Sequence, residues 1–449
     1  MRRRGIAIIV VAVLAVAAGV YAERAYNPGP MAFAGGSTVA LADYHEADPT
    51  GVPAELAESN IVTHGEYLAR AADCEVCHTA PGGAAYAGGL AIPLPFGTIY
   101  TTNITPDKAT GIGDYSDADF LNAVQRGIRK DGSRLYPAMP YPSYTYMTDA
   151  DALAIKAYLF SQPAVHAVNR PTTLGFPYDQ RWSMVPWSWP FNANSRFAPN
   201  TARSPQWNRG AYLAEALAHC GECHSPRNVA FAVNNRKKFA GAITAGWHAF
   251  NITSDKGTGI GDWSDDEVFA YLAKGHALNR GTAAGPMGEA VDQSFSRLSP
   301  SDIRALVVYL RSIPAIASPD LPATIAPPAP VRPDAGNAGA SASALGKTVF
   351  EEACVSCHDW TGVSAISQFA SISGSRAVND PGATNVVQIV LSGTTRRSPE
   401  GIISMPAFGK SYSDTEIAAV ANYVTARFGT DASQVTAEDV AKLRTQTVR

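Results

Sequence analysis

The chain has 449 residues, enough for roughly two to four domains, and its hydrophobic fraction of 46% is ordinary for globular protein. Its formal net charge is −3, and no cluster of Lys and Arg resembles a phosphate-binding surface. Composition and charge therefore exclude nucleic acid as an expected partner.

The first segment, residues 1–22, is predicted to be a membrane anchor or a signal peptide. Three arginines precede an apolar run that extends over residues 5–22. This run of about 18 residues is short for a membrane-spanning helix and long for the core of a signal peptide. Its last three residues also fit a signal-peptidase site. Both alternatives export everything after residue 22, because the arginines stay in the cytoplasm.

An internal repeat follows a tether that we assign to residues 23–60, which are small and polar and contain Pro and Gly. The sequence Asn-Ile-Thr at 103–105 recurs at 251–253, and Gly-Ile-Gly-Asp at 111–114 recurs at 259–262. From residue 103 onward the two copies align at a constant offset of 148 positions, which carries Met139 onto Met287.

Several helix boundaries can be predicted from capping residues. Ser116 and Ser264 are expected to begin amphipathic helices, since an acidic residue follows three positions later and a glycine ends each run. A last helix is expected in each of three units. Its N-caps are Thr148, Ser299 and Ser413, and its capping boxes are completed by Asp151, Asp302 and Glu416.

These patterns divide the chain into three units, 61–165, 206–314 and 344–430. The connector 166–205, together with Trp207, holds a cluster of tryptophans. Packing between domains is the simpler interpretation of this cluster, and a docking surface for a partner or the membrane interface is the alternative. Residues 315–343 are rich in Pro and Ala and indicate a semi-extended linker. Residues 431–449 form a polar tail.

Each unit contains one Cys-x-x-Cys-His motif, and the three motifs use all six cysteines of the chain. Two intervening residues place both sulfurs where they can form thioether bonds to the vinyl groups of one haem, and the next residue, His, then lies beneath the iron. The sequence therefore predicts three covalently bound haem c groups. The attachment residues are Cys74, Cys77, Cys220, Cys223, Cys354 and Cys357, and the proximal ligands are His78, His224 and His358.

Two other uses of six cysteines were weighed. Exported chains often form disulfides, but a disulfide framework does not explain a histidine after every pair. A structural zinc site can take two Cys pairs, but three pairs cannot be matched two by two. Haem attachment is the interpretation that accounts for every cysteine and every adjacent histidine.

Methionine is the expected sixth ligand of each iron, which raises the potential and closes the iron to small ligands. Met139, Met287 and Met405 each lie between the cysteine motif and the last helix of a unit, and a proline beside each one stiffens its loop. Met147 is the alternative candidate for the sixth ligand in the first unit, and Met184 is expected to have only a packing role. Four histidines could replace a methionine in principle, but none recurs between the copies: His64, His219, His248 and His276.

The chain resembles the triple-haem cytochrome c subunit of membrane-bound periplasmic dehydrogenases, over about Gly65 to Gly429. The segments that carry this resemblance are Ala-Ala-Asp-Cys at 71–74, Tyr-Thr-Thr-Asn-Ile-Thr at 100–105, Leu-Tyr-Pro-Ala-Met-Pro-Tyr at 135–141, Ala-His-Cys-Gly-Glu-Cys-His at 218–224 and Ala-Gly-Pro-Met at 284–287.

The resemblance implies a mainly α fold of three tandem cytochrome c domains. It also implies a position at the periplasmic face of the bacterial cytoplasmic membrane. Such subunits relay electrons to ubiquinone from a catalytic subunit of the PQQ, flavin or molybdopterin type. Several members attach to the membrane through C-terminal amphipathic segments, whereas the tail after Gly429 is polar here. That departure favours the N-terminal run as the anchor and, weakly, a molybdopterin partner.

Electron transfer is thus the expected function, and the chain is not expected to be an enzyme on its own. No nucleotide-binding loop or hydrolytic triad is visible in the sequence. Two alternatives stay open. A haem enzyme such as a peroxidase or nitrite reductase would need an open iron, and a haem subunit of a terminal oxidase could also be anchored at its N-terminus.

Overall fold

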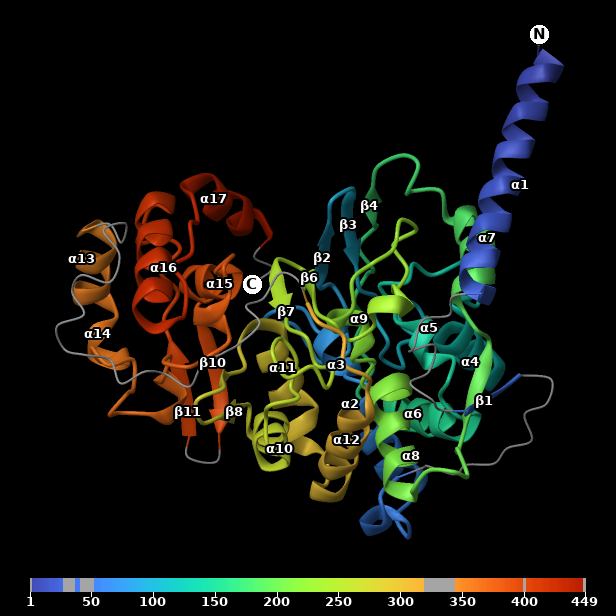
Figure 1. The fold of residues 1–449 in the computed structure, drawn as a ribbon. Helices are drawn as coiled ribbons and strands as arrows, with labels where there is room; N and C mark the ends of the chain where they lie inside the picture. The colour runs from blue at the N-terminus through green and yellow to red at the C-terminus, as the bar shows by residue number, and fades with distance from the viewer. Residues whose placement is uncertain (1, 27–36, 41–51, 319–343, 399–400, 447–449) are drawn as a thin grey trace.

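The computed structural model describes residues 2–26, 37–40, 52–318, 344–398 and 401–446. These residues form a mainly helical protein in which the strands form small antiparallel sheets of two or three short strands. Figure 1 shows the third unit, in orange and red, on one side of the second unit, and the first unit on the other. The middle unit therefore contacts both of its neighbours.

The first unit consists of a long first helix, a short helix at the cysteine motif, a hairpin and three further helices. Their bounds are α2 Ile61–Ala71, α3 Cys74–Cys77, β2 Ala91–Leu94, β3 Gly97–Tyr100, α4 Asp117–Arg126, α5 Tyr141–Tyr144 and α6 Asp149–Ser161. Strand β4, Thr173–Leu174, extends the hairpin to three strands in the order β2-β3-β4.

The second unit repeats this plan. Its elements are α8 Pro205–Tyr212, the π-helix η4 Leu213–Leu217, α9 Gly221–His224, β6 Ala242–Thr244, β7 Trp247–Ala249, α10 Asp265–Lys274, β8 His276–Ala277, β9 Gly281–Thr282, α11 Gly285–Gln293 and α12 Pro300–Ser312. The repeated Asn-Ile-Thr folds identically in both copies. The amide of Asn103 donates to Thr110 at 3.0 Å and its oxygen accepts from Thr105, and Asn251 makes the same pair of bonds.

The third unit contains α13 Ala344–Ala353, α14 Val355–His358, α15 Thr384–Ser392, the hairpin β10 Thr394–Ser398 and β11 Gly401–Met405, and α16 Asp414–Phe428. The sequence analysis did not anticipate α17, Ala437–Gln446, within the polar tail. This helix buries Val440 completely, and Arg444 forms a 2.6 Å ion pair with Asp414. The tail is thus packed on the third unit.

All three units share one close crossing of their first and last helices. Gly65, Gly210 and Gly346 each lie against a backbone carbonyl of the last helix, those of Ala154, Ala305 and Ala419 respectively. A Cβ added at these glycines would lie 1.8, 1.9 and 2.2 Å from the carbonyl oxygen. Only glycine therefore permits this helix separation, and the shared crossing relates the third unit to the other two.

The predicted caps agree with the structure at most positions. Complete capping boxes form at Ser116, Ser264 and Ser413, and the left-handed Gly127 and Gly275 end α4 and α10. Thr148 and Ser299 also cap the last helices of their units. The carboxylates of Asp151 and Asp302, expected to complete boxes there, accept hydrogen bonds from tyrosines of the other copy.

The tryptophan cluster divides into two groups. Trp207 is buried and its indole N–H donates to Ser312, and Trp187 of α7, Met184–Phe191, donates to the carbonyl of Ala230. Trp187, which also contacts the ring of Tyr141, therefore packs between the first two units, whereas Trp207 packs inside the second unit. Trp182 and Trp189 are 70% and 86% exposed. The connector also carries β5, Ser195–Ala198, which pairs with β1, Ser37–Ala40, inside the expected tether.

Helix α1, Arg2–Tyr26, projects from the body of the protein beside α7 (Figure 1). Its described side chains, Ile9 to Tyr21, are apolar and mostly exposed. Among the residues whose placement is described, no helix is long and apolar enough to cross a membrane. The described residues therefore do not support the predicted membrane-spanning helix at the N-terminus. The side chains of residues 1–8 and 22 are not among those described.

The third unit is held on the second by buried arginines. Arg396 of β10 is 3% exposed and forms a 2.8 Å ion pair with Asp292 of α11. Arg376 donates to the carbonyl of Gly259 at 2.8 Å and to that of Thr258, in the repeated Gly-Ile-Gly turn. Most of the expected Pro/Ala-rich linker, residues 319–343, lies outside the described part of the chain.

Candidate haem-binding sites

Each cysteine motif lies on a short helix, α3, α9 or α14, directly after the first helix of its unit. The six cysteines all lie within the described residues and form no disulfide. Burial raises the pKa of Cys74 and of Cys220 to about 12, so these sulfurs stay protonated as thiols at neutral pH. Thiols held next to a histidine in this way are the groups that thioether attachment of a haem requires.

The three motif histidines share one orientation. The Nδ1 atom of His78 lies 2.6 Å from the carbonyl oxygen of Thr102, and His224 and His358 make the same contact, also at 2.6 Å, with Phe250 and Ala370. A carbonyl can only accept, so Nδ1 carries the proton and donates it. Burial also lowers the pKa of each ring, which favours neutral imidazole. Nε2 is then the atom that presents a lone pair to a metal.

These carbonyls are not predicted by the cysteine motifs, although the repeat carries a signal for two of them. Thr102 immediately precedes Asn103 of the first Asn-Ile-Thr, and Phe250 immediately precedes Asn251 of the second. The Asn side chain fixes the turn by bonding to two threonines that follow it, two and seven positions later in the chain. The repeated turn therefore holds the backbone oxygen that orients the histidine.

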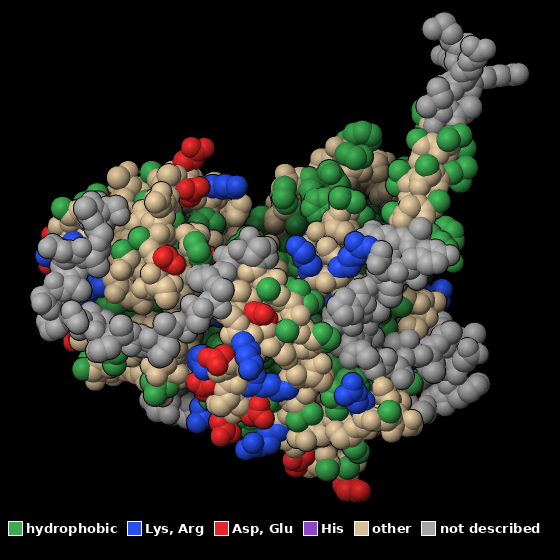
Figure 2. Space-filling model, viewed as in Figure 1, with side chains coloured by type: hydrophobic (Ala, Val, Ile, Leu, Met, Phe, Trp, Pro, Cys, Tyr) green, Lys and Arg blue, Asp and Glu red, His purple; other side chains and the backbone are tan. Residues whose placement is uncertain are grey.

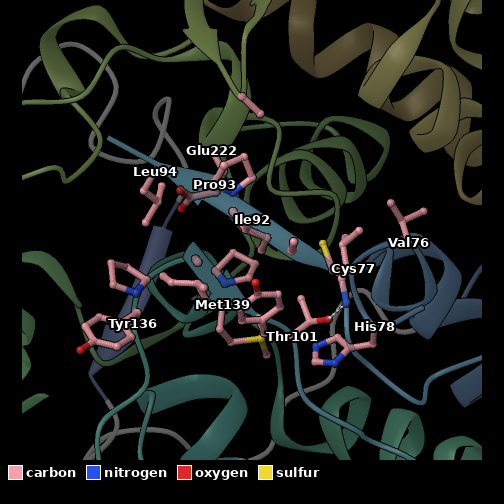
Figure 3. A pocket seen from close by; sticks show the side chains of 18 of the residues that line it. Val76, Cys77, His78, Ile92, Pro93, Leu94, Thr101, Tyr136, Met139 and Glu222 are labelled. Atoms are coloured by element: carbon pink, nitrogen blue, oxygen red, sulfur yellow. Dashed lines mark hydrogen bonds between the residues drawn. The ribbon is translucent and has the colours of Figure 1, made fainter. Parts of the chain in front are cut away.

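A cavity of about 2460 Å³ opens beside the first motif (Figure 3). It is larger than the roughly 300–1,000 Å³ of an ordinary ligand pocket. All four candidate haem residues of the first unit line it, and in Figure 3 Cys77, His78 and Met139 face the same space. Most of its lining is apolar, contributed by the β2–β3 hairpin and by the Pro-Ala-Met-Pro loop. A planar, largely apolar macrocycle suits such a lining.

The cavity reaches parts of the other two sites. Cys223 lines it from the second unit and Met405 from the third, whereas the remaining candidate haem residues of these units lie outside its described lining. Met287 packs at the edge of the hydrophobic core, at the start of α11. The cavity thus brings together the complete predicted set of the first unit, together with one candidate residue from each of the other two units.

The rival ligands have other surroundings. Met147 is 1% exposed in the hydrophobic core, although it touches the cavity, as does Met184. Of the four other histidines, His219 lines the cavity, whereas His64, His248 and His276 are not part of its described lining. His64 bonds to the carbonyl of Leu56 at 2.8 Å, His248 pairs with Asp380 at 3.0 Å, His276 bonds to Thr282 at 2.9 Å, and His219 packs against the ring of Tyr144.

The first two motifs lie close to one another. Tyr144, which follows the Met139 loop, donates a 2.6 Å hydrogen bond to the carbonyl of Ala72, two residues before the first motif. Ser143 donates to Glu222, inside the second motif, at 3.0 Å. Tyr144 also packs against His219 of the second unit, so Ser143 and Tyr144 connect the segment before the first motif with the second motif.

Two family models match the chain, "Cytochrome c" over residues 62–163 and "Cytochrome C oxidase, cbb3-type, subunit III" over residues 341–424. The fructose dehydrogenase cytochrome subunit of Gluconobacter japonicus is 38% identical over 89% of this chain and 85% of its own length. The gluconate 2-dehydrogenase cytochrome c subunit of Pantoea cypripedii is 39% identical over 87% and 91%.

A third relative is the cytochrome c subunit of the quinone alcohol dehydrogenase of Gluconacetobacter polyoxogenes, 36% identical over 86% of this chain and 85% of its own length. These relatives are electron-transfer subunits, and cytochrome c domains bind haem c covalently. With similarity at this level over most of both sequences, the chain belongs to the family of cytochrome c subunits of dehydrogenase complexes.

Proposed function

We propose that this chain relays electrons through three covalently bound haem c groups, from a catalytic dehydrogenase subunit to ubiquinone, at the periplasmic face of the bacterial cytoplasmic membrane. The observation that carries the proposal is the common setting of His78, His224 and His358. Each follows a cysteine pair, and each donates Nδ1–H to a backbone carbonyl at 2.6 Å. These hydrogen bonds orient all three imidazoles in the same way, so that each can bind a metal through Nε2.

Each candidate residue has one role in this proposal. The two cysteines of each motif attach the porphyrin, and the motif histidine is the proximal ligand. Met139, Met287 and Met405 are the distal ligands. Haem supplies a one-electron centre, and Met/His coordination gives it a high potential. The apolar lining around the first site excludes water, which also raises the potential because the oxidised iron carries the extra charge.

Attachment to the membrane is part of the proposal. It is supported by the N-terminal arginines and apolar run, and by the exposed Trp182 and Trp189 in the connector that α1 contacts. Figure 2 shows green apolar side chains gathered on α1 and on the neighbouring edge of the protein. Tryptophan is enriched where a protein meets the headgroup region of a bilayer.

A second candidate function is a haem subunit of a terminal oxidase. One observation favours it, namely the match of residues 341–424 to the model of a cbb3-type oxidase subunit. The dehydrogenase relatives align over far more of the chain, so we prefer the first candidate.

Two measurements test the proposal. The pyridine haemochrome assay should give three haems per chain, and Cys354→Ala combined with Cys357→Ala should give two. A chain purified from detergent-solubilised membranes should bring with it a catalytic dehydrogenase subunit, and the isolated complex should reduce a ubiquinone analogue. A colourless protein would refute haem binding, and co-purification of an oxidase core would favour the second candidate.

A further inference from the structure

A buried ion pair lies beside the second cysteine motif. Glu215 and Lys238 are 3% and 8% exposed, and the ammonium of Lys238 contacts the Glu215 carboxylate directly. Tyr309 of α12 donates a 2.5 Å hydrogen bond to the other carboxylate oxygen of Glu215. The carboxylate is thus held between a cation and a phenol in the interior of the second unit.

Lys238 of this pair packs against α9, the helix that carries the second cysteine motif. A Cβ added at Gly221, the first residue between the two cysteines, would lie 3.0 Å from Cε of Lys238. The corresponding residues of the other motifs are Glu75 and Val355, so only the second motif leaves this space open. The backbone N–H of Phe239 donates to Ser225 at 3.0 Å, which holds the lysine segment against the end of α9.

A local irregularity of the first helix brings Glu215 into the interior. Seven positions separate Tyr67 from Cys74 in the first copy, whereas eight separate Tyr212 from Cys220 in the second. The extra residue is accommodated in the π-helix η4, Leu213–Leu217, which has Glu215 at its centre. A π-helix is the usual outcome of a one-residue insertion into a helix, and it often occurs at functional sites.

The first helix of the first copy, α2, is a regular α-helix and shows where a charged residue lies without the π-helix. Counted from the tyrosine, Glu215 corresponds to Arg70, which forms a partly exposed ion pair with Glu66. Counted from the cysteine, it corresponds to Ala69, which is 1% exposed. The wider turn therefore places a carboxylate where the first copy has a buried methyl group.

We propose that the buried Glu215–Lys238 pair sets the reduction potential of the haem held by the second motif, and so distinguishes the middle centre from the first. The inference rests on the haem assignment proposed above. Charges act strongly on a nearby iron in a low-dielectric interior, whereas exposed charges are screened by solvent. Lys238 favours the reduced iron and Glu215 favours the oxidised iron, so their balance fixes the potential. Both residues are positioning residues, because they would act through their charges and are not themselves candidate ligands.

Spectroelectrochemical titration of the full chain in detergent tests this inference, after the pyridine haemochrome assay has established three haems. Glu215→Gln leaves Lys238 uncompensated and should move one of three one-electron steps to higher potential. Lys238→Gln should move the same step to lower potential, and the double variant should shift less than either single variant. The other two steps should coincide with those of the wild type.

The partly exposed pair of the first copy provides the matched control. Glu66→Gln combined with Arg70→Gln should leave all three steps unchanged, because solvent screens that pair. With three haems present, single variants that shift no step, or that shift it in the same direction, overturn the inference. A wild-type chain with fewer than three haems refutes the proposed function instead.

If the charge variants lose haem, a variant that retains both charges can test the same inference. Tyr309→Phe keeps both charges and removes one donor from Glu215, so the carboxylate carries more effective negative charge. The same step should then move to lower potential. A Tyr309→Phe chain that has three haems and an unchanged titration also overturns the inference.

Discussion

The phenol of Tyr212 donates a 2.6 Å hydrogen bond to Asp151, a residue in the first turn of the last helix of the preceding copy. Tyr67 of the first copy makes the equivalent bond to Asp302 of the second, at 2.5 Å. In both cases the phenol oxygen also accepts the backbone N–H of the N-cap residue, at 3.1 and 3.0 Å. The first two copies therefore cap each other's last helix reciprocally.

We predict that Tyr212→Phe and Tyr67→Phe each lower the free energy of unfolding by about 1.5–3 kcal/mol, since a hydrogen bond to a charged group contributes that much. Denaturant titration measures the change. Tyr178→Phe is the control, because this ring is 41% exposed and stacks on Phe96. Unfolding curves of the two variants that coincide with the wild type would show that the reciprocal bonds do not stabilise the pair of copies.

The same tyrosines predict a loss of stability in alkali. Burial and the neighbouring Asp151 raise the pKa of Tyr212 well above 10 in the folded chain, whereas the unfolded chain releases this proton near pH 10. The unfolded state therefore binds fewer protons above pH 10, and stability present below that pH is lost as pH rises. Each such tyrosine contributes about 1.4 kcal/mol per pH unit.

Tyr212→Phe should reduce this loss. The free energy of unfolding, measured between about pH 9 and about pH 11, should fall less steeply for the variant than for the wild type. Parallel pH profiles for the two proteins would contradict the assignment of the slope to Tyr212.

The close helix crossing and the helix propensity of alanine predict opposite effects of Gly210→Ala on stability. Propensity alone favours Gly210→Ala by up to about 1 kcal/mol. The added Cβ would lie 1.9 Å from the carbonyl oxygen of Ala305, so the two helices must separate, and overpacking of this kind costs about 1–3 kcal/mol or more. A lower melting temperature is the expected result. Gly175→Ala is the control, because its nearest neighbour would be 3.7 Å away. An unchanged or raised melting temperature for Gly210→Ala would exclude the close crossing.

Met405→Ala tests the distal ligand of the third site. The haem should remain attached through the cysteines, but the potential of that centre should fall and its iron should bind carbon monoxide, because the thioether sulfur is gone. Redox titration and the spectrum of the reduced protein with carbon monoxide measure both effects. Met184→Ala is the control. A redox titration identical to that of the wild type would show that Met405 is not a ligand.

The local sequence predicts the chemistry of the candidate haem sites and much of the local structure. The cysteine and histidine spacing specifies a covalent haem motif without reference to the fold, since the residues that matter are neighbours in the chain. Helix caps are local as well, which is why Ser116, Ser264 and Ser413 could be identified from residues three positions away. The repeat likewise predicted that Asn103 and Asn251 occupy equivalent places.

The contacts that join distant segments could not be predicted from the local sequence and are known only from the fold. The carboxylates of Asp151 and Asp302 accept hydrogen bonds from tyrosines of the other copy. The burial of Glu215 depends on a π-helix, which no capping or periodicity rule predicts. Helix α17 was missed because its stability comes from packing on the third unit rather than from a strong apolar pattern of its own. Local sequence fixes which groups can bind a haem, and long-range packing fixes the charges and hydrogen bonds that surround it.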